Sequence, residues 1–149
     1  MALNDIARAI CEALRLEPHP EGGWYRETWR APEDSGARSA GTAIHFLLGA
    51  DERSHWHTVD AAEIWCWHAG DPLMLELADE RESDRRTVTL GADVLAGHVP
   101  QAIVPAHHWQ AARSVGGSAG YSLVSCIVVP GFDFAGFTLA PPDWNPGQS

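Results

Sequence analysis

The chain has 149 residues, of which 45% are hydrophobic and 20% are charged, and its net charge is −10 at pH 7. A chain of this length and composition is expected to fold as one domain, residues 1–149, around its own hydrophobic core. The excess of negative charge excludes the cationic surface that binding to nucleic-acid phosphates requires, and it disfavours anionic membrane surfaces. We therefore expect neither nucleic acid nor a membrane as a partner.

The cysteines and the N-terminus indicate where the protein resides. Cys11, Cys66 and Cys126 lie far apart, and each sits in an apolar run, which favours buried thiols over a disulfide. The N-terminus lacks a basic region followed by an apolar segment, and no apolar run reaches the length of a membrane span. These features predict a cytoplasmic protein.

Residues 3–16 have the one persuasive helical pattern in the chain. Asn4 is a suitable N-cap, and Pro18 and Pro20 are expected to end the helix. The apolar residues that recur at helical spacing are Leu3, Ile6, Ile10 and Leu14.

From residue 24 to residue 139, short apolar or mixed stretches alternate with Gly, Pro and charged turns. The expected strands are Trp24–Arg30, Thr42–Leu48, Ser54–Thr58, Glu63–His68, Leu73–Leu77, Thr87–Leu90, Gln101–Val104, Trp109–Ser114, Tyr121–Val129 and Phe132–Leu139. Many short strands without strand–helix alternation predict an all-β sandwich or barrel. Residues 140–149 form a proline-rich tail without periodicity.

The stretch Gly49–Leu75 carries the residues best suited to chemistry. If Ser54–Thr58 is a strand, alternation places His55 and His57 on one face, and a returning strand brings Glu63 beside them. Two imidazoles and a carboxylate that converge could bind one divalent metal, with Fe, Mn, Ni or Zn as candidates. The alternative is a polar pocket floor that satisfies its own hydrogen bonds.

Two tryptophans are expected on the same side as this cluster. Trp65 and Trp67 share the face of Glu63 because residues two apart in a strand point the same way. They either form an aromatic wall for a ligand or fill the core. The sequence leaves both interpretations open.

An earlier strand offers further ligand-binding candidates. Alternation places Tyr25 and Glu27 on one face and Arg26 on the other. A guanidinium suits a carboxylate or a phosphate, although Arg26 could equally make an intramolecular salt bridge. His19, before Pro20, is interpreted as structural.

The spacing of Gly49, His55, His57, Glu63 and Gly70 resembles the first motif of the cupin superfamily. Further blocks are similar to one uncharacterised single-domain subfamily, cupin family five. These blocks are PHPEGGWYRE at residues 18–27, AGDPL at 69–73, VPA at 104–106, WQA at 109–111 and PGFDF at 130–134. Together they extend the resemblance from residue 16 to residue 139.

The resemblance implies a double-stranded β-helix, or jelly-roll barrel, with ligands in the barrel mouth. It also implies a homodimer, often formed by edge-strand exchange. In metal-binding cupins the first motif supplies two histidines and a glutamate, and a second motif supplies one histidine. Transferred to this chain, the metal ligands would be His55, His57, Glu63 and Gln110.

The chain departs from that pattern in two places. Five residues, Thr58–Ala62, separate His57 from Glu63, where cupins have three or four. Gln110 stands where the fourth ligand would be, and its amide oxygen is a weaker donor to a transition metal than imidazole. His108, two residues earlier, is an alternative ligand on the same strand face.

Three functions follow as hypotheses. The first is an isomerase- or epimerase-like enzyme acting on a carbohydrate or related small polar metabolite. In it, His55 or His57 is the general base, Glu63 orients that base or binds metal, and Arg26 holds an anionic group. The second is a metal-dependent oxygenase, and the third a non-catalytic binding protein for a sugar, nucleotide or organic acid. The residues expected to contact the ligand are Tyr25, Arg26, Glu27, Trp65, Trp67 and Gln110.

Overall fold

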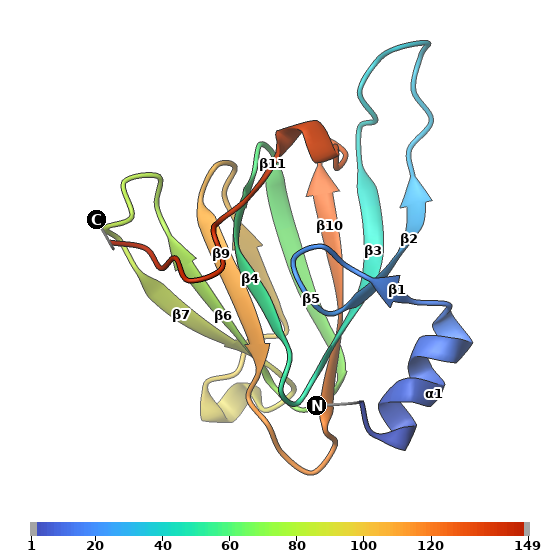
Figure 1. The fold of residues 1–149 in the computed structure, drawn as a ribbon, viewed down its shortest axis with the longest axis vertical. Coiled ribbons are helices and arrows are strands. Elements are labelled where there is room, and N and C mark those ends of the chain that lie inside the picture. Colours follow the sequence, from blue (N-terminus) through green and yellow to red (C-terminus); the bar gives the residue numbers. More distant parts are fainter. Residues whose placement is uncertain (1–2, 148–149) are drawn as a thin grey trace.

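The structure, a computed structural model, describes residues 3–147 and shows two antiparallel sheets that face each other, with a helix on the outside (Figure 1). Residues 1, 2, 148 and 149 of the predicted domain and tail lie outside the described residues. The all-β prediction with one N-terminal helix is confirmed over the described part of the chain.

Each sheet is built from antiparallel neighbours. The six-stranded sheet has the order β1 (Glu17–Pro18), β2 (Trp24–Arg30), β3 (Thr42–Gly49), β10 (Tyr121–Val129), β5 (Ala62–Gly70) and β8 (Gln101–Val104). The five-stranded sheet has the order β11 (Phe137–Leu139), β4 (Arg53–Val59), β9 (Trp109–Ser114), β6 (Leu73–Ala78) and β7 (Arg86–Leu90). This interleaving of the chain between two sheets is the jelly-roll arrangement.

The predicted strands agree with the observed ones to within one or two residues at each end, apart from the last. The stretch Phe132–Leu139 was expected to be a single strand, and that expectation is wrong. A 3₁₀-helix, η2 (Phe134–Gly136), precedes the short β11. The Asp133 side chain accepts a hydrogen bond from the backbone nitrogen of Ala135 at 3.1 Å, and this cap favours the helical turn over a strand. A second 3₁₀-helix, η1 (Val94–Ala96), follows β7.

Helix α1 spans Asp5–Leu14 and is shorter than predicted. Asn4 caps it, its side chain accepting from the Ala7 nitrogen at 2.8 Å. The helix ends through Arg15, whose left-handed backbone (φ 57°) stops it before Pro18 is reached. Ile6, expected on the buried face, is 63% exposed, whereas Ala7 is fully buried. The helix therefore packs on the outside of the six-stranded sheet through a face centred on Ala7.

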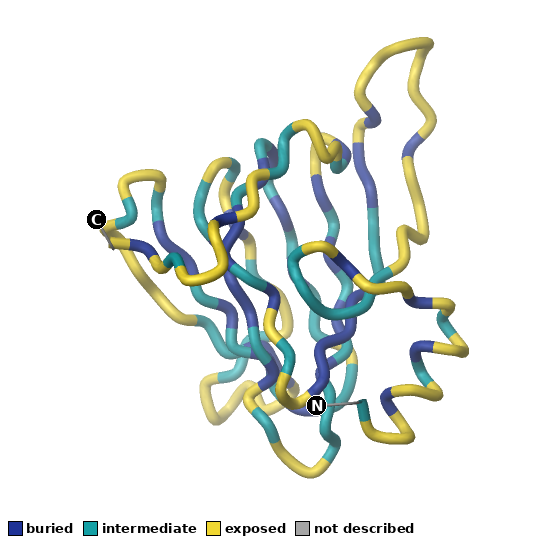
Figure 2. The backbone as a smooth tube through the Cα atoms, viewed as in Figure 1, coloured by how far each residue is buried: buried dark blue, intermediate teal, exposed yellow. Residues whose placement is uncertain are grey.

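The hydrophobic core fills one end of the space between the sheets. Its buried residues include Phe46, Leu48, Trp65, Leu73, Leu75, Leu77, Leu90, Val104 and Val124. Figure 2 shows that the buried positions lie along the strands and that the connecting loops are largely exposed. The other end of the barrel is left for polar residues and a cavity, which determines where a ligand site can lie.

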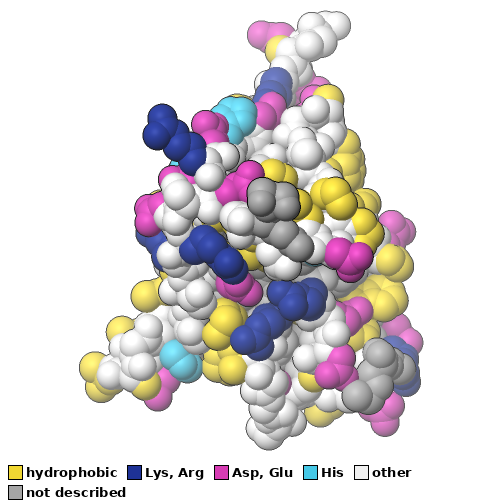
Figure 3. Space-filling model, turned by 60° about the vertical axis from the view of Figure 1, so that its left-hand side comes forward, with side chains coloured by type: hydrophobic (Ala, Val, Ile, Leu, Met, Phe, Trp, Pro, Cys, Tyr) yellow, Lys and Arg dark blue, Asp and Glu magenta, His cyan; other side chains and the backbone are white. Residues whose placement is uncertain are grey.

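Two further predictions concern the cysteines and membranes. Cys11, Cys66 and Cys126 are free thiols, and two of them are buried, in agreement with the sequence interpretation. Among residues 3–147, no helix is both long enough and apolar enough to cross a membrane. On the face drawn in Figure 3, arginines and carboxylates are interspersed rather than gathered into a patch of one sign.

Candidate functional site

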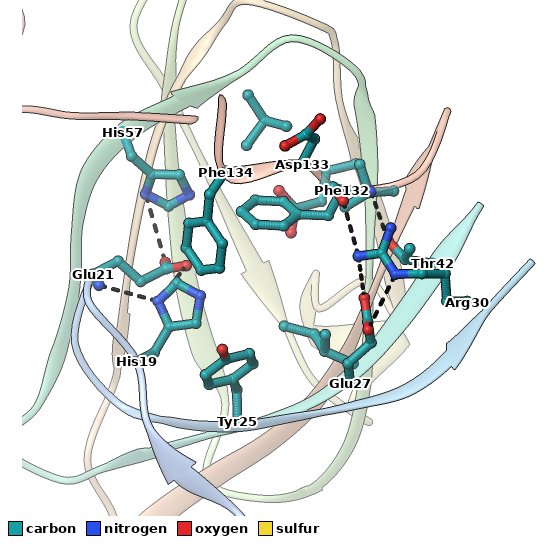
Figure 4. A pocket seen from close by; sticks show the side chains of 14 residues that line it. His19, Glu21, Tyr25, Glu27, Arg30, Thr42, His57, Phe132, Asp133 and Phe134 are labelled. Atoms are coloured by element: carbon teal, nitrogen blue, oxygen red, sulfur yellow. Dashed lines mark hydrogen bonds and ion pairs between the residues drawn. The ribbon is translucent and has the colours of Figure 1, made fainter. Parts of the chain in front are cut away.

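A cavity of about 390 Å³ opens at the polar end of the barrel (Figure 4). Its inner end holds four side chains, which we call the buried cluster: His19, His57 and Glu63, which are buried residues, and Glu21, whose side chain is only 9% exposed. Aromatic walls come from Tyr25, Phe132 and Phe134, and the exposed rim carries Glu27, Arg30 and Asp133. The volume suits a small metabolite.

Glu21 enters the barrel because its loop is pressed against β4. The His55 nitrogen donates to the Glu21 carbonyl oxygen at 2.7 Å and thereby ties the loop to the strand. Gly22 follows with a φ of +110°, and a Cβ at this position would overlap the carbonyl oxygen of Arg53. Only glycine tolerates both the conformation and the close approach. Gly22 thus allows the loop to lie against β4 and Glu21 to reach into the barrel.

Glu21 is the hub of the buried cluster. Its Oε2 accepts a hydrogen bond from Ser54 Oγ and lies 3.5 Å from His57 Nδ1. Its Oε1 lies 3.3 Å from His19 Nδ1, and that same nitrogen accepts from the Glu21 backbone N–H at 3.0 Å. His19 Nδ1 is therefore an acceptor, so neutral His19 carries its proton on Nε2.

A β-bulge in β4 overturns the expectation that His55 and His57 share a face. Ser54 pairs with Ala112 and His57 with Gln110, so two residues of β4, His55 and Trp56, oppose the single residue Ala111 of β9. This extra residue resets the alternation, so that Ser54 and His57 both reach Glu21.

His55 instead points to the C-terminal tail. Its Nε2 lies 2.8 Å from the Pro141 carbonyl oxygen, and it lines a separate surface cleft with Trp56 and Trp144. The predicted convergence of His55 with His57 and Glu63 is therefore wrong in geometry.

Glu63 is held by a hydrogen-bonded chain that joins the two sheets. Gln110 Nε2 donates to Glu63 Oε1 at 2.9 Å, and Trp65 Nε1 donates to Gln110 Oε1 at 2.9 Å. All three side chains are buried. This series of hydrogen bonds uses both the NH₂ group and the oxygen of the Gln110 amide, and it fixes the Glu63 carboxyl at the inner end of the cavity.

Burial raises the pKa values of the carboxyl groups in the buried cluster and lowers those of its imidazoles. It raises the pKa of Glu63 to about 7, against the lowering effect of the Gln110 hydrogen bond. Burial, followed by the nearby Glu63 charge, raises the pKa of Glu21 well above its ordinary value. Burial also lowers the pKa values of His19 and His57 to about 4. At neutral pH the site holds neutral imidazoles beside Glu63, which is about half protonated.

The neutral form of His57 has a defined tautomer. Its Nδ1 lies 2.7 Å from the His55 carbonyl oxygen, which can only accept, so Nδ1 carries the proton. Nε2 is then the basic nitrogen of the ring. This orientation suits His57 to take a proton from a bound molecule.

The predicted ligand-binding residues fall into two groups. Tyr25 and Glu27 line the cavity, whereas Arg26 does not; Arg26 lines a separate outer depression, to which Tyr25 and Glu27 also contribute. Trp65 and Trp67 do not line the cavity; Trp65 belongs to the core, and Trp67 packs against it and donates to the Asp71 carbonyl oxygen at 3.0 Å. The core-filling alternative thus describes the tryptophans. Gln110 acts from behind the cavity, through Glu63.

Several lining residues had no place in the predicted site. Arg30 joins the rim because the pairing of β2 is irregular between Glu27 and Trp29. With regular alternation, Arg30 would instead lie on the same face of β2 as Arg26. His19 and Glu21 belong to the PHPEGG block of the family resemblance; His19 was interpreted as structural, and Glu21 was given no role of its own. Phe132 and Phe134 lie in the PGFDF block, expected to be strand rather than cavity wall.

A divalent metal, which the fold family implies, does not fit the predicted ligand set. His55 is turned to the tail and the Gln110 oxygen accepts from Trp65, so only His57, through Nε2, and Glu63 of the four predicted ligands line the cavity. His108 does not line the cavity. Within residues 3–147, no group of three or more His, Cys, Asp or Glu side chains is arranged to hold a metal ion. The donor set that the resemblance implies is thus not brought together by the fold.

Fold and site together define a cupin, a jelly-roll barrel with a polar cavity at one end. The model of the family described as Cupin superfamily (DUF985) matches residues 8–140. The chain belongs to this family, which confirms the resemblance seen in its sequence. A search of curated proteins finds no match.

Solved structures support the assignment. A hypothetical protein from Leishmania major is 38% identical, with a TM-score of 0.81, over 90% of this chain and 86% of that one. A protein from Shewanella oneidensis is 36% identical, with a TM-score of 0.83, over 94% and 85% of the two chains. A variant of oxalate decarboxylase from Bacillus subtilis is 13% identical, with a TM-score of 0.59, over 83% of this chain and 29% of that one, which shows a shared fold alone.

Proposed function

We propose that this cupin is an enzyme that moves protons on a small polar metabolite, with isomerase- or epimerase-like chemistry. The observation that carries the proposal is the buried cluster, in which a neutral imidazole and buried carboxyls of raised pKa line one cavity. A base and an acid whose environments push their pKa values apart are the elements of general acid–base catalysis.

The roles follow from the geometry. His57 takes a proton from a carbon next to a carbonyl group, through Nε2, because its Nδ1–H is held by the His55 carbonyl oxygen. Protonated Glu63 donates its proton to the carbonyl oxygen, which gives a neutral enol. Return of a proton to a different carbon, or to the opposite face of the same carbon, yields the isomer or epimer and restores both groups. The sequence of steps neither consumes nor requires an oxidant.

Glu21 acts on His57 rather than on the substrate. Its Oε2 lies 3.5 Å from His57 Nδ1, and Ser54 fixes the same oxygen. The imidazolium formed during proton transfer lies beside the Glu21 carboxyl group, whose oxygen can stabilise its positive charge. Glu21 is accordingly a positioning residue.

The test is hydrogen exchange, since it detects proton abstraction whatever the product is. A panel of aldoses, ketoses and 2-oxo acids is incubated with the protein in deuterium oxide, and loss of carbon-bound proton signals is followed by NMR. We expect exchange with at least one compound, and a loss of at least about 100-fold in His57→Ala. His68→Ala is the matched control, because His68 is exposed and bonds to Ser125 outside the cavity.

The other two functions predict different outcomes. A compound that binds but never exchanges supports the non-catalytic binding protein. Oxygen consumption that depends on a bound redox metal supports the oxygenase. Either result contradicts the acid–base proposal.

We also propose that the protein forms a homodimer in the cytoplasm. β1 pairs with β2 at Trp24 and Tyr25, so within the described residues the outer edge of β2 from Arg26 to Arg30 has no neighbouring strand. Such an edge gains backbone hydrogen bonds when it pairs with another strand. Light scattering should give a mass near twice 16.2 kDa. A mass of 16.2 kDa at micromolar concentration would contradict the dimer.

A further inference from the structure

The rim of the cavity carries more negative than positive charge. Its arginine, Arg30, is bound by Glu27, with Nη2 2.6 Å from Oε1, and it also donates to the Phe132 carbonyl oxygen at 3.0 Å. The positive charge of Arg30 is therefore balanced inside the protein. Asp133 adds a second carboxylate to the same rim.

Arg38, which does not line the cavity, does not offset Asp133. Arg38 senses the charge of Asp133, but its guanidinium forms two hydrogen bonds with Asp60, at 2.9 and 2.7 Å. Among the described residues, the ion pairs include none that joins Asp133 to a basic side chain. The rim consequently presents a net negative charge to an incoming molecule.

The inner end contributes no positive charge at neutral pH. His19 and His57 are neutral, because burial holds their pKa values near 4. Glu63, with a pKa of about 7, adds up to one further negative charge. The net charge of the whole chain is also negative, because it has 20 acidic residues against 10 arginines and lysines. A charge of this sign attracts cations and repels anions.

Three aromatic rings stand beside this negative charge. Tyr25, Phe132 and Phe134 line the cavity, and the rings of Phe132 and Phe134 are 4.8 Å apart at 88°. In this edge-to-face arrangement the two rings are perpendicular. Figure 4 shows Phe132, Phe134 and Asp133 in the same part of the cavity. Aromatic rings near a carboxylate stabilise organic ammonium groups.

From this combination we propose that the cavity selects a small metabolite bearing an alkylammonium group, and that Asp133, Phe132 and Phe134 hold that group at the rim. The inference rests on the proposed function, because it assigns the substrate class of the same cavity. It replaces the anionic group expected near Arg26, since that residue does not line the cavity.

The experiment compares two molecules of one shape. Choline and its uncharged carbon isostere, in which a tert-butyl group replaces the trimethylammonium group, are titrated into the protein by ligand-observed NMR. We expect choline to bind at least about tenfold more tightly than the isostere, which reflects the cation–π and carboxylate contacts.

Two variants locate the selectivity. Asp133→Asn removes the charge but keeps an oxygen that can accept from Ala135, and Phe134→Leu removes a half-exposed ring without opening the core. Each should weaken choline binding about threefold or more and leave isostere binding unchanged. Asp143→Asn, in the separate cleft on the tail, is the matched control and should change neither.

The outcomes separate the two proposals. Equal affinity for choline and the isostere, with both lost in a Tyr25→Ala variant, overturns the cation inference and leaves the cavity as the ligand site. Tighter binding of the isostere than of choline also overturns it. Binding of choline that is unaffected by Asp133→Asn and Phe134→Leu overturns the assignment to this rim. The loss of exchange activity in His57→Ala is measured separately, and it tests the proposed function independently of the cation inference.

Discussion

Glu63 couples the protonation of the cavity to the stability of the fold. Its pKa is raised by burial from an ordinary 4.5 to about 7. Below pH 4.5 the carboxyl is protonated in both the folded and the unfolded chain, so it has no effect on the pH dependence. Between pH 4.5 and 7 the unfolded chain loses this proton while the folded chain keeps it. The free energy of unfolding therefore falls as pH rises through this window.

The size of the effect follows from the pKa difference. Each pKa unit corresponds to about 1.4 kcal/mol, so the ionisation of Glu63 removes about 3 kcal/mol of stability between pH 4.5 and 7. Glu63→Gln abolishes this titration while keeping an oxygen that accepts from Gln110. The free energy of unfolding of Glu63→Gln minus that of the wild type should then rise by about 3 kcal/mol across the window.

The measurement is urea denaturation at closely spaced pH values, followed by tryptophan fluorescence. The difference between the two proteins removes the opposite trend of His19 and His57, whose lowered pKa values cost stability as pH falls from 6.5 to about 4. Glu33→Gln, at an exposed loop position, is the control and should give a flat difference. A flat difference for Glu63→Gln as well would refute the reasoning, because it would mean that Glu63 ionises as it does in water.

Other predictions concern the core, the inter-sheet bridge and the tail. Trp65→Phe leaves the buried Gln110 oxygen without its donor, so the free energy of unfolding measured by urea denaturation should fall by about 1–3 kcal/mol. A fall below about 0.5 kcal/mol, the size of a surface effect, would mean that the Trp65–Gln110 hydrogen bond is dispensable. Leu75→Ala opens a cavity in the fully buried core and should cost about 2–5 kcal/mol by the same assay, unless the core is loosely packed. His55→Ala should leave the exchange activity unchanged, and also the metal content, which is measured by plasma mass spectrometry. Proteolysis near Pro141 should become faster, because the variant loses the contact between His55 and the Pro141 carbonyl oxygen. A loss of bound metal would restore His55 as a ligand.

The sequence was sufficient for the architecture because that information is local. Alternating hydrophobicity and Gly/Pro turns defined nearly every strand, and Asn4 defined the start of the helix. The end of the helix was less predictable, since the left-handed conformation of Arg15 has no clear signature in a residue other than glycine or asparagine.

The sequence predicted the residues of the site only in part, and the errors in predicting which way side chains face have one cause. Of the three candidates on β2, Tyr25 and Glu27 line the cavity and Arg26 does not, which is the grouping that alternation gives. Alternation failed for His55 and for Arg30, where a bulge adds a residue and reverses the facing of the residues after it. A bulge depends on how two strands pair, which one strand's own sequence does not reveal.

By itself, then, the sequence determined the fold, the family and two members of the buried cluster, His57 and Glu63. The tertiary structure decided which other side chains join them. It brought in Glu21, which is distant from His57 in the sequence and reaches it because Gly22 allows the loop to lie against β4. It also set the protonation of the cluster, because a pKa depends on burial and on neighbouring charges, and both exist only once the barrel has closed.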